Sequence, residues 1–357
     1  MILLDGNYGE GGGQIVRTAL ALSALTQKPF EVTGIRKGRS QGGLKNQHLY
    51  AIKALQELCD ADVEGAVLGS EHLKFTPHGL KARTLVIDIE TAGSITLLLQ
   101  ALLLPCFFAE RKIFIRITGG TDTKWSMPVD YMKEILLPHL INYGSIDFRI
   151  LRRGYYPKGG GKVEVSVESP YALADFRDFD GLHNFLKNEN KAINLIEQGT
   201  LAQVKGISHA SQDLQPARVA ERQSQSAKVV LSDLKCPVSI DEVYAQSSCT
   251  GSGLLLWAVF SADNDGTMRI GADSLGEKGK KSELVGKEAA ERLIDEVHYN
   301  APVDEHLADN LIPWLALFGG KMKVSKVSNH TRTNIYTTEK FLDVKFKVKD
   351  NIIESIL

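Results

Sequence analysis

The chain has few cysteines, no long apolar run and almost no net charge, and each absence excludes a class of protein. Its four cysteines are scattered among 357 residues without metal-ligand spacing, which favours reduced packing residues over a disulfide framework. The longest apolar run, residues 97–109, contains Gln100 and Pro105 and is too short to span a bilayer. A net charge of -1 argues against bulk coating of nucleic acid but allows a local basic groove.

The N-terminus also lacks a basic segment followed by an apolar core, so we expect no export signal. Together with the cysteine usage, this predicts a cytoplasmic protein without a membrane association.

A glycine-rich segment at residues 9–17, Gly-Glu-Gly-Gly-Gly-Gln-Ile-Val-Arg, is the most informative feature that is present. It follows the apolar residues 2–4 and precedes the apolar residues 18–25, a pattern that predicts strand, turn and helix. Such a turn exposes backbone N–H groups to an anion, and Arg17 adds a fixed charge. The glycines could also serve only to make a tight turn. The segment is neither a Walker loop, since no Gly-Lys-Ser/Thr follows, nor a dinucleotide fingerprint, since Gln14 replaces the third glycine.

Three segments of the chain share one order of elements, which predicts an α/β (α+β) fold built on a repeated unit. In each segment an apolar helix precedes a β-rich run, and a polar loop, a second helix and a strand-like stretch follow. The apolar helices are expected at 15–25, 95–104 and 307–318, the β runs at 30–35, 113–118 and 322–327, the second helices at 44–58, 129–142 and 333–341, and the closing strands at 73–76, 162–167 and 344–348.

Equivalent loops of such units could converge around a pseudo-threefold axis. The first loop is cationic, with Arg36 and Arg39 followed by Gln47. The second carries Asp122 and ends at Pro128, and the third, residues 328–334, offers His330 among hydrogen-bonding side chains. Arginines on oxygens and an imidazole as base or nucleophile suit a phosphoryl-type site.

Residues 194–279 break this rhythm and predict an inserted smaller α/β domain, with the repeated core formed by residues 1–193 and 280–357. The insertion has its own helix, 216–234, and its own strands, including the apolar run 253–260. None of the candidate catalytic residues falls inside it.

Individual residues allow more than one interpretation. A lone histidine such as His330 is more often structural than nucleophilic, but its place in the third equivalent loop favours catalysis. Asp309 and Asn310 could belong to the solvent stripe of an apolar helix, or Asp309 could hold a divalent metal that carries phosphates. The run 152–161, rich in arginine, tyrosine and glycine, predicts either a hairpin turn or a contact with single-stranded nucleic acid.

Taken together, these residues resemble the RNA 3'-terminal phosphate cyclases over essentially the full chain. The matching segments are 10–14 with Arg17, 36–39, 47–49, 91–94 through Gln100, 119–122, 153–161, 307–309, and His330 with 333–335. The resemblance implies a core of three βαβαββ units with an inserted smaller α/β domain, in agreement with the repeats.

The resemblance also implies a ligase-type nucleotidyltransferase that acts on ATP and an RNA with a 3'-phosphate, with a divalent metal (Mg²⁺ or Mn²⁺). A histidine takes AMP from ATP, passes it to the RNA 3'-phosphate, and the 2'-hydroxyl then closes a 2',3'-cyclic end. His330 matches the adenylated histidine. The remaining matches are Arg17, Arg36, Arg39 and Gln47 as contacts to phosphate or the RNA end, Glu10 and Asp309 as metal and nucleotide positions, and Gln100, Pro128, His306 and Asn310 as further nucleotide positions.

One position departs from the family pattern, and two other classes remain open. The family is expected to have a tyrosine where this chain has His306, whose imidazole can also stack on adenine. Some relatives are cyclase-like proteins that act in ribosome biogenesis and lack the nucleophilic histidine, and a third class with the repeated fold transfers enolpyruvyl groups. The presence of His330 favours the enzyme. The oligomeric state stays open at this stage.

Overall fold

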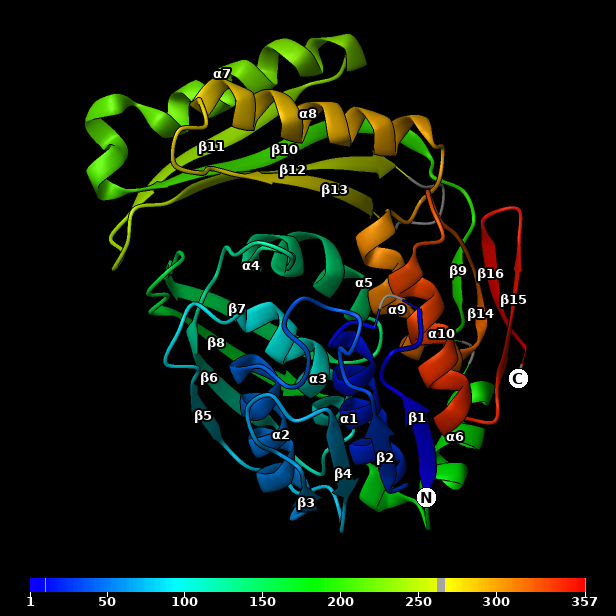
Figure 1. Ribbon diagram of the computed structural model, residues 1–357. Coiled ribbons are helices and arrows are strands. Elements are labelled where there is room, and N and C mark those ends of the chain that lie inside the picture. Colours follow the sequence, from blue (N-terminus) through cyan, green and yellow to red (C-terminus); the bar gives the residue numbers. More distant parts are fainter. Residues whose placement is uncertain (10, 190, 262–266, 357) are drawn as a thin grey trace.

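A computed structural model describes residues 1–9, 11–189, 191–261 and 267–356, and it has a mixed α/β architecture with four small mixed sheets in the described part (Figure 1). Three sheets and their helices form the lower body in Figure 1, and the fourth lies above them under two long helices. The four cysteines are free, with Cys59 and Cys106 buried. Among the described residues, no helix combines the length and the apolar character needed to cross a membrane.

The first sheet has the order β1-β2-β4-β3, with β1 and β2 parallel and the other pairs antiparallel. Its strands are β1 (Ile2–Asp5), β2 (Phe30–Thr33), β3 (Asp62–Glu64) and β4 (His72–Thr76), and its helices are α1 (Gln14–Thr26) and α2 (Asn46–Cys59). Helix α1 is apolar on all sides except its first turn, so burial rather than amphipathic patterning stabilises it. All of its residues are buried.

The second sheet repeats this pairing in the order β5-β6-β8-β7, again with one parallel pair followed by antiparallel pairs. Its strands are β5 (Leu85–Asp88), β6 (Ile113–Gly119), β7 (Ser145–Arg152) and β8 (Gly161–Glu168), and its helices are α3 (Ile95–Phe107), α4 (Val129–Tyr131), the π-helix η1 (Met132–Leu136) and α5 (Leu137–Leu140). Ser94 begins α3 by accepting a hydrogen bond from the backbone N–H of Leu97, as an N-cap serine does.

The third sheet has the same pairing pattern in the order β9-β14-β16-β15, but its first two strands are far apart in sequence. Its strands are β9 (Ile193–Leu195), β14 (Gly320–Lys323), β15 (Lys345–Lys349) and β16 (Ile352–Ile356), and its helices are α9 (Glu305–Phe318) and α10 (Asn329–Phe341). The 3₁₀ turn η2 (Leu173–Asp175) and α6 (Phe179–Asn188) lead from β8 to β9.

The fourth sheet, in the order β11-β10-β12-β13, lies within the segment predicted as an insertion. Its strands are β10 (Thr200–Ser211), β11 (Val238–Ala245), β12 (Ser252–Ser261) and β13 (Thr267–Leu275), and its helical elements are η3 (Gln212–Ala217), α7 (Val219–Leu231), η4 (Ser232–Leu234) and α8 (Ser282–His298). The boundary at residue 279 stays a prediction, and α8, which follows it, packs on this sheet through Val285 and Leu293.

Strand β12 is apolar throughout because both faces of the fourth sheet are covered. Leu254, Leu256 and Phe260 pack under α7 and α8, whereas Leu255 and Trp257 belong to the core of the lower body. A strand buried on both faces reads as a continuous apolar run rather than an alternating one. The fourth sheet is therefore joined to the rest of the molecule by a shared apolar core.

The buried carboxylate of Asp304 ties the fourth sheet to the start of α9. Its Oδ1 accepts the backbone N–H groups of His306 and Leu307 and the Tyr131 hydroxyl at 2.6 Å, and its Oδ2 accepts the backbone N–H of Gly271 in β13 at 2.9 Å. Burial, and next the Asp304 charge, raise the pKa of Tyr131 well above its usual value, so this phenol keeps the proton that it donates. One side chain thus fixes α9, α4 and β13 relative to each other.

The buried ring of His48 in α2 packs against the glycine-rich turn at Gly13. Its Nδ1 accepts the backbone N–H of Lys45 at 2.9 Å, and its Nε2 lies where a Cβ at Gly13 would have to sit. Burial, followed by the charges of Arg17 and Arg36, lowers the pKa of His48 to about 3. The ring is therefore neutral in the folded protein throughout the physiological range.

We predict that replacing Asp304 by Asn lowers the free energy of unfolding by about 1–3 kcal/mol, the cost of leaving a buried polar partner unsatisfied. Asparagine keeps one acceptor oxygen, but its NH₂ group replaces the other oxygen. That NH₂ group is a donor, so either the hydrogen bond from Tyr131 or the one from Gly271 is lost. The control is Asp178→Asn, because Asp178 only caps α6 and Asn caps as well as Asp. Equal unfolding temperatures for the two variants would contradict the structural role of Asp304.

We further predict that His48 makes the fold less stable as the pH drops. In the unfolded chain His48 takes up a proton near its ordinary pKa of 6.5, whereas in the folded protein it stays neutral until about pH 3. The free energy of unfolding therefore falls as the pH drops below 6.5. The loss attributable to His48 is about 2 kcal/mol between pH 7 and pH 5. Denaturant unfolding at both pH values should give a flatter dependence for His48→Gln than for the unsubstituted chain, and parallel dependences would refute the prediction.

Candidate functional site

The candidate site forms around the first turns of α1, where three polar side chains are buried and must find partners. Gln14 Nε2 donates to Asp309 Oδ2 in α9 at 3.3 Å, Arg17 Nε donates to Gln100 Oε1 in α3 at 3.1 Å, and Thr18 Oγ1 donates to Asn334 Oδ1 in α10 at 2.7 Å. Buried polar groups without such partners would cost several kcal/mol. The start of α1 is therefore bonded to three other helices.

A second set of hydrogen bonds links these partners to one another. Gln100 Nε2 donates to Asn310 Oδ1 at 2.9 Å, and Asn310 Nδ2 donates to the backbone oxygen of His306 at 2.7 Å and to Asp309 Oδ1 at 2.9 Å. The structure thus brings together four residues that the sequence nominated separately, Arg17, Gln100, Asp309 and Asn310. They line one pocket with Pro313 and Trp314.

Charges in this network are unusually desolvated. Burial lowers the pKa of Arg17 to about 10, partly offset by the Asp309 carboxylate. Burial raises the pKa of Asp309, while His306 and His330 act in the opposite direction. Both histidines therefore lie within electrostatic reach of Asp309, each from the first turn of its helix, α9 or α10.

His330 lies in the first turn of α10, not in a loop as the sequence predicted. Ser328 caps this helix by accepting the backbone N–H of Thr331 at 3.0 Å, so the polar run 328–334 is a helix start. The imidazole of His330 is exposed to solvent. A helix start holds this side chain more rigidly than a free loop would.

The glycine-rich turn packs against the same helix. Tyr8 and Tyr336 stack with their ring centroids 4.0 Å apart, and a Cβ on Gly9 would be 2.9 Å from Thr333 Oγ1. Gly9 also has a positive φ of 63°, which glycine adopts without strain. Glu10, predicted as a metal and nucleotide ligand, lies outside the described residues.

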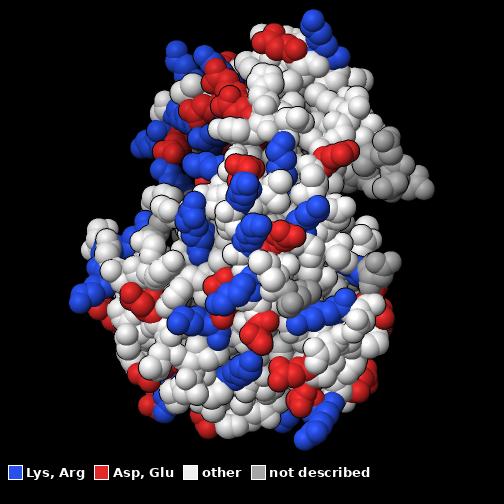
Figure 2. Space-filling model, turned by 90° about the vertical axis from the view of Figure 1, so that its right-hand side faces the viewer, with Lys and Arg blue, Asp and Glu red and all other residues white. Residues whose placement is uncertain are grey.

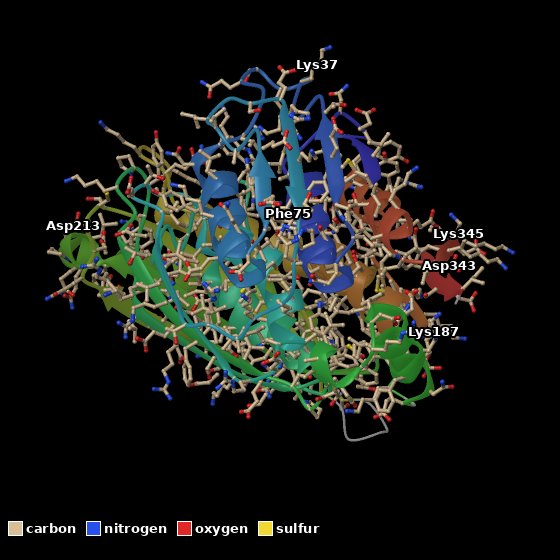
Figure 3. The ribbon with its side chains drawn as sticks, turned by 90° about the horizontal axis from the view of Figure 1, so that it is seen from below. Lys37, Phe75, Lys187, Asp213, Asp343 and Lys345 are labelled. Carbon is tan, nitrogen blue, oxygen red and sulfur yellow. The ribbon has the colours of Figure 1, made fainter. Side chains whose placement is uncertain are left out.

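The cationic loop after β2 covers the other side of this turn. Arg36 is partly buried with a positive φ of 57°, and burial, followed by the Arg39 charge, lowers its pKa. Arg39 Nη2 would be 3.8 Å from a Cβ on Gly12, so the second arginine lies over the turn. Lys37, by contrast, is at the outer tip of this loop (Figure 3). Arg17, Arg36 and Arg39 together place three positive charges around the turn, a charge distribution that suits an anion.

The remaining nominated residues lie at the margins of this region. Gln47 is partly buried, with its Cβ 3.7 Å from a Cβ placed on Gly93. Pro128 is buried and caps the short helix α4, whose Tyr131 meets the ring of His306 edge-on at 6.2 Å. The sequence therefore missed Tyr131 as a neighbour of His306.

The pKa of His306 is raised, although burial alone would lower it. The carboxylates of Asp304, Asp309 and Asp273 outweigh burial, and Asp273 comes from β13 of the fourth sheet. Asp304, which holds the start of α9, was not nominated from the sequence. Its signal was available, because an aspartate directly before an apolar helical pattern is a typical N-cap.

Two residues from the predicted loops are buried in an interface with the fourth sheet. Asp122, expected to add a carboxylate to the converging loops, pairs with Arg153 at 3.3 Å and with His209 of β10 at 3.2 Å. Tyr155, from the run predicted as either a hairpin turn or a nucleic-acid contact, shares a hydrogen bond with His209 Nδ1 at 2.9 Å. These residues attach the β7–β8 loop to the fourth sheet instead.

The same cluster is the one group of His, Cys, Asp and Glu within the described residues with a metal-like arrangement, formed by Asp122, Asp130 and His209. Arg153 already supplies the cation, since its Nη1 is 2.7 Å from Asp130 Oδ2. The guanidinium therefore balances the negative charge of the two carboxylates, as a metal ion would.

Comparison with known proteins agrees with this arrangement. The sequence profile described as RNA 3'-terminal phosphate cyclase matches residues 8–348. A protein of that name from Pyrococcus abyssi is 44% identical over 353 residues, which cover 99% of this chain and 96% of that protein. Proteins with the same name from Pyrococcus furiosus and Methanopyrus kandleri are 43% and 40% identical, over 99% and 98% of this chain and 97% and 95% of theirs. The chain therefore belongs to the RNA 3'-terminal phosphate cyclase family.

Proposed function

We propose that this protein uses ATP to convert an RNA 3'-phosphate into a 2',3'-cyclic phosphate through a covalent histidine–AMP intermediate. A ring nitrogen of His330 attacks the α-phosphorus of ATP, forming an N–P bond as the P–O bond to pyrophosphate breaks. An oxygen of the RNA 3'-phosphate then attacks the AMP phosphorus, and the N–P bond to His330 breaks. Finally the 2'-oxygen attacks the phosphorus of the RNA 3'-phosphate, AMP leaves, and the hydroxyl proton is released.

The position of His330 carries this proposal. It is an exposed imidazole at a helix start, within electrostatic reach of the buried Asp309, beside a turn flanked by three arginines. A neutral imidazole is a good nucleophile for phosphorus. Holding it on a helix rather than a loop limits the motion that would otherwise reduce the attack rate.

The arginines and a divalent ion would offset the charge that builds on the phosphate oxygens. Asp309 is the described carboxylate best suited to hold Mg²⁺ or Mn²⁺, since magnesium usually takes one or two carboxylates and phosphate oxygens. Its two oxygens accept from Gln14 and Asn310, which orients the carboxylate. His306, with Pro128 and Tyr131 nearby, would contact the adenine ring. The last step benefits from a nucleophile on the same ribose.

We also propose that the three similarly paired sheets represent repeated units arranged around a pseudo-threefold axis. Their shared order of one parallel and two antiparallel pairs supports this. Helices α1, α3 and α9, the first helices of the three units, would then contribute equivalent parts to one site. The reaction would class the protein as a ligase that forms AMP and diphosphate.

We predict that His330→Ala abolishes the protein–AMP adduct while leaving the fold intact. The side chain is exposed, so its removal opens no core cavity. Incubation with α-labelled ATP and detection of an acid-labile label on the protein measures the adduct. His298→Ala, another exposed histidine, is the matched control and should be labelled normally. Full labelling of the His330 variant, or label mapped to His306 or His48, would sink the assignment.

We predict that Arg39→Lys impairs cyclisation by about 10-fold or more, because a planar guanidinium holds phosphate oxygens in a way that an ammonium does not. Arg36→Ala and Arg39→Ala should lose at least as much. Comparing free ATP with pre-adenylated RNA locates each arginine: a defect only with ATP places it at the nucleotide, and a defect with both places it at the RNA end. Arg149→Ala, on an exposed strand, is the control. If none of the three changes activity, the loop is not part of the site.

A further inference from the structure

The outward faces of the three similarly paired sheets differ in charge, although their pairing is the same. In the first sheet, residues that share the outer face by register include four carboxylates and one lysine: Asp5, Glu31, Asp62, Glu64 and Lys74. In the second sheet, four cations face four carboxylates: Arg116, Arg149, Arg152 and Lys162 against Asp88, Asp147, Glu164 and Glu168. The first face is acidic and the second is balanced.

The third sheet is strongly cationic on the corresponding face. Its register aligns five lysines with one carboxylate: Lys321 and Lys323 on β14, Lys345, Lys347 and Lys349 on β15, and Glu354 on β16. The opposite face of the sheet is buried at its centre, where Met322 and Ile353 are fully inaccessible, so the lysines project to solvent. We call these five lysines the lysine face.

Local pairing neutralises only part of this charge. Lys347 and Lys321 flank Glu354 in one row of the sheet, and Lys345 lies 3.4 Å from Glu339. The row of Lys349, Ile352 and Lys323 has no carboxylate in register. Figure 2 looks onto this side of the molecule, and lysine and arginine side chains gather over its middle.

The lysine face shares a strand with the segment that leads to the proposed catalytic histidine. β14 ends at Lys323, and the chain then passes directly to Ser328 and the start of α10 with His330. β15 runs parallel to β14 on the far side of β16, so the carboxylate-free row is at the end of the sheet from which the chain leads on to His330. Lys345 marks the other end, at the outer edge of the molecule (Figure 3).

We propose that the lysine face binds the phosphate backbone of the RNA strand upstream of its 3' end. Lysines two residues apart on a strand are about 6.8 Å apart, which lets successive ammonium groups meet successive phosphates of an extended strand. Such contacts are independent of base sequence and add affinity by releasing counterions. The proposal rests on RNA being the substrate, as argued above, and it adds where the body of that RNA lies.

The test uses the full chain with Lys323, Lys347 and Lys349 changed together to Gln. The RNAs are 3'-phosphorylated oligonucleotides of about 20 and about three nucleotides. We expect the triple variant to bind the long RNA about 10-fold or more weakly, with the salt dependence of log affinity reduced by about 2. The KM for the long RNA should rise while kcat, the short RNA and labelling by ATP stay unchanged.

Two controls separate a site from general charge. The triple change to Arg keeps the charge and should keep the affinity. Arg116, Arg149 and Lys162 of the second sheet, changed together to Gln, remove as much charge from a balanced face and should weaken binding far less. Equal losses for the two Gln triples, or an unchanged affinity and salt dependence for the lysine triple, would overturn the proposal.

Fluorescence anisotropy with the long RNA separates this inference from the proposed reaction. If the unsubstituted protein binds the RNA through these lysines but forms no AMP adduct, the reaction is wrong and the lysine face stands. If the adduct and cyclisation occur with the same KM in the lysine triple, the reaction stands and the lysine face is wrong. Loss of binding to anionic lipid vesicles with unchanged RNA binding would likewise overturn it in favour of a membrane partner.

Discussion

Burial of α1 on every side is the constraint on which the rest of the structure depends. Helices α2, α3 and α10 pack around it, and all thirteen of its residues are buried. Its apolar residues fill the core, but Gln14, Arg17 and Thr18 in its first turns cannot be left without partners. Helices α9, α3 and α10 each supply one, and the resulting polar network is the candidate site. The candidate site thus lies at the polar N-terminal turns of the central helix α1.

Much of the fold could be predicted from the sequence because periodicity reports burial. The apolar helices α1, α3 and α9 have the positions that their patterns indicate, within two or three residues at each end. The helix at residues 329–341 begins earlier than predicted, because its first turn is polar and its cap, Ser328, resembles a loop residue. Local sequence cannot distinguish a polar helix start from a polar loop when the partner groups are elsewhere in the chain.

The residues of the candidate site could be predicted only where they belong to a sequence motif that resembles the family. The resemblance nominated Arg17, Gln100, Asp309 and Asn310, and the structure brings them into one hydrogen-bonded set. The resemblance gave no indication that Asp122 and Tyr155 both contact His209. That histidine is on the fourth sheet, and no local sequence pattern links it to them. Long-range pairing of buried charges is a property of the assembled fold. The guanidinium of Arg153 pairs with Asp122 and Asp130, two of the three residues whose arrangement resembles a metal site.

The parallel pair β9 and β14 has a consequence for how the protein is made. Two complete sheets precede β9, and their strands pair with neighbours that are close in the chain, so they can form while synthesis continues. β9 must wait for β14 until the whole fourth sheet, α8 and α9 have emerged. Closing such a long loop is slow, since its entropy is lost before any contact is gained. His330 follows β14 closely, so the proposed catalytic histidine would reach its place only in the last stage of folding, and an unfinished chain would not carry out the proposed reaction.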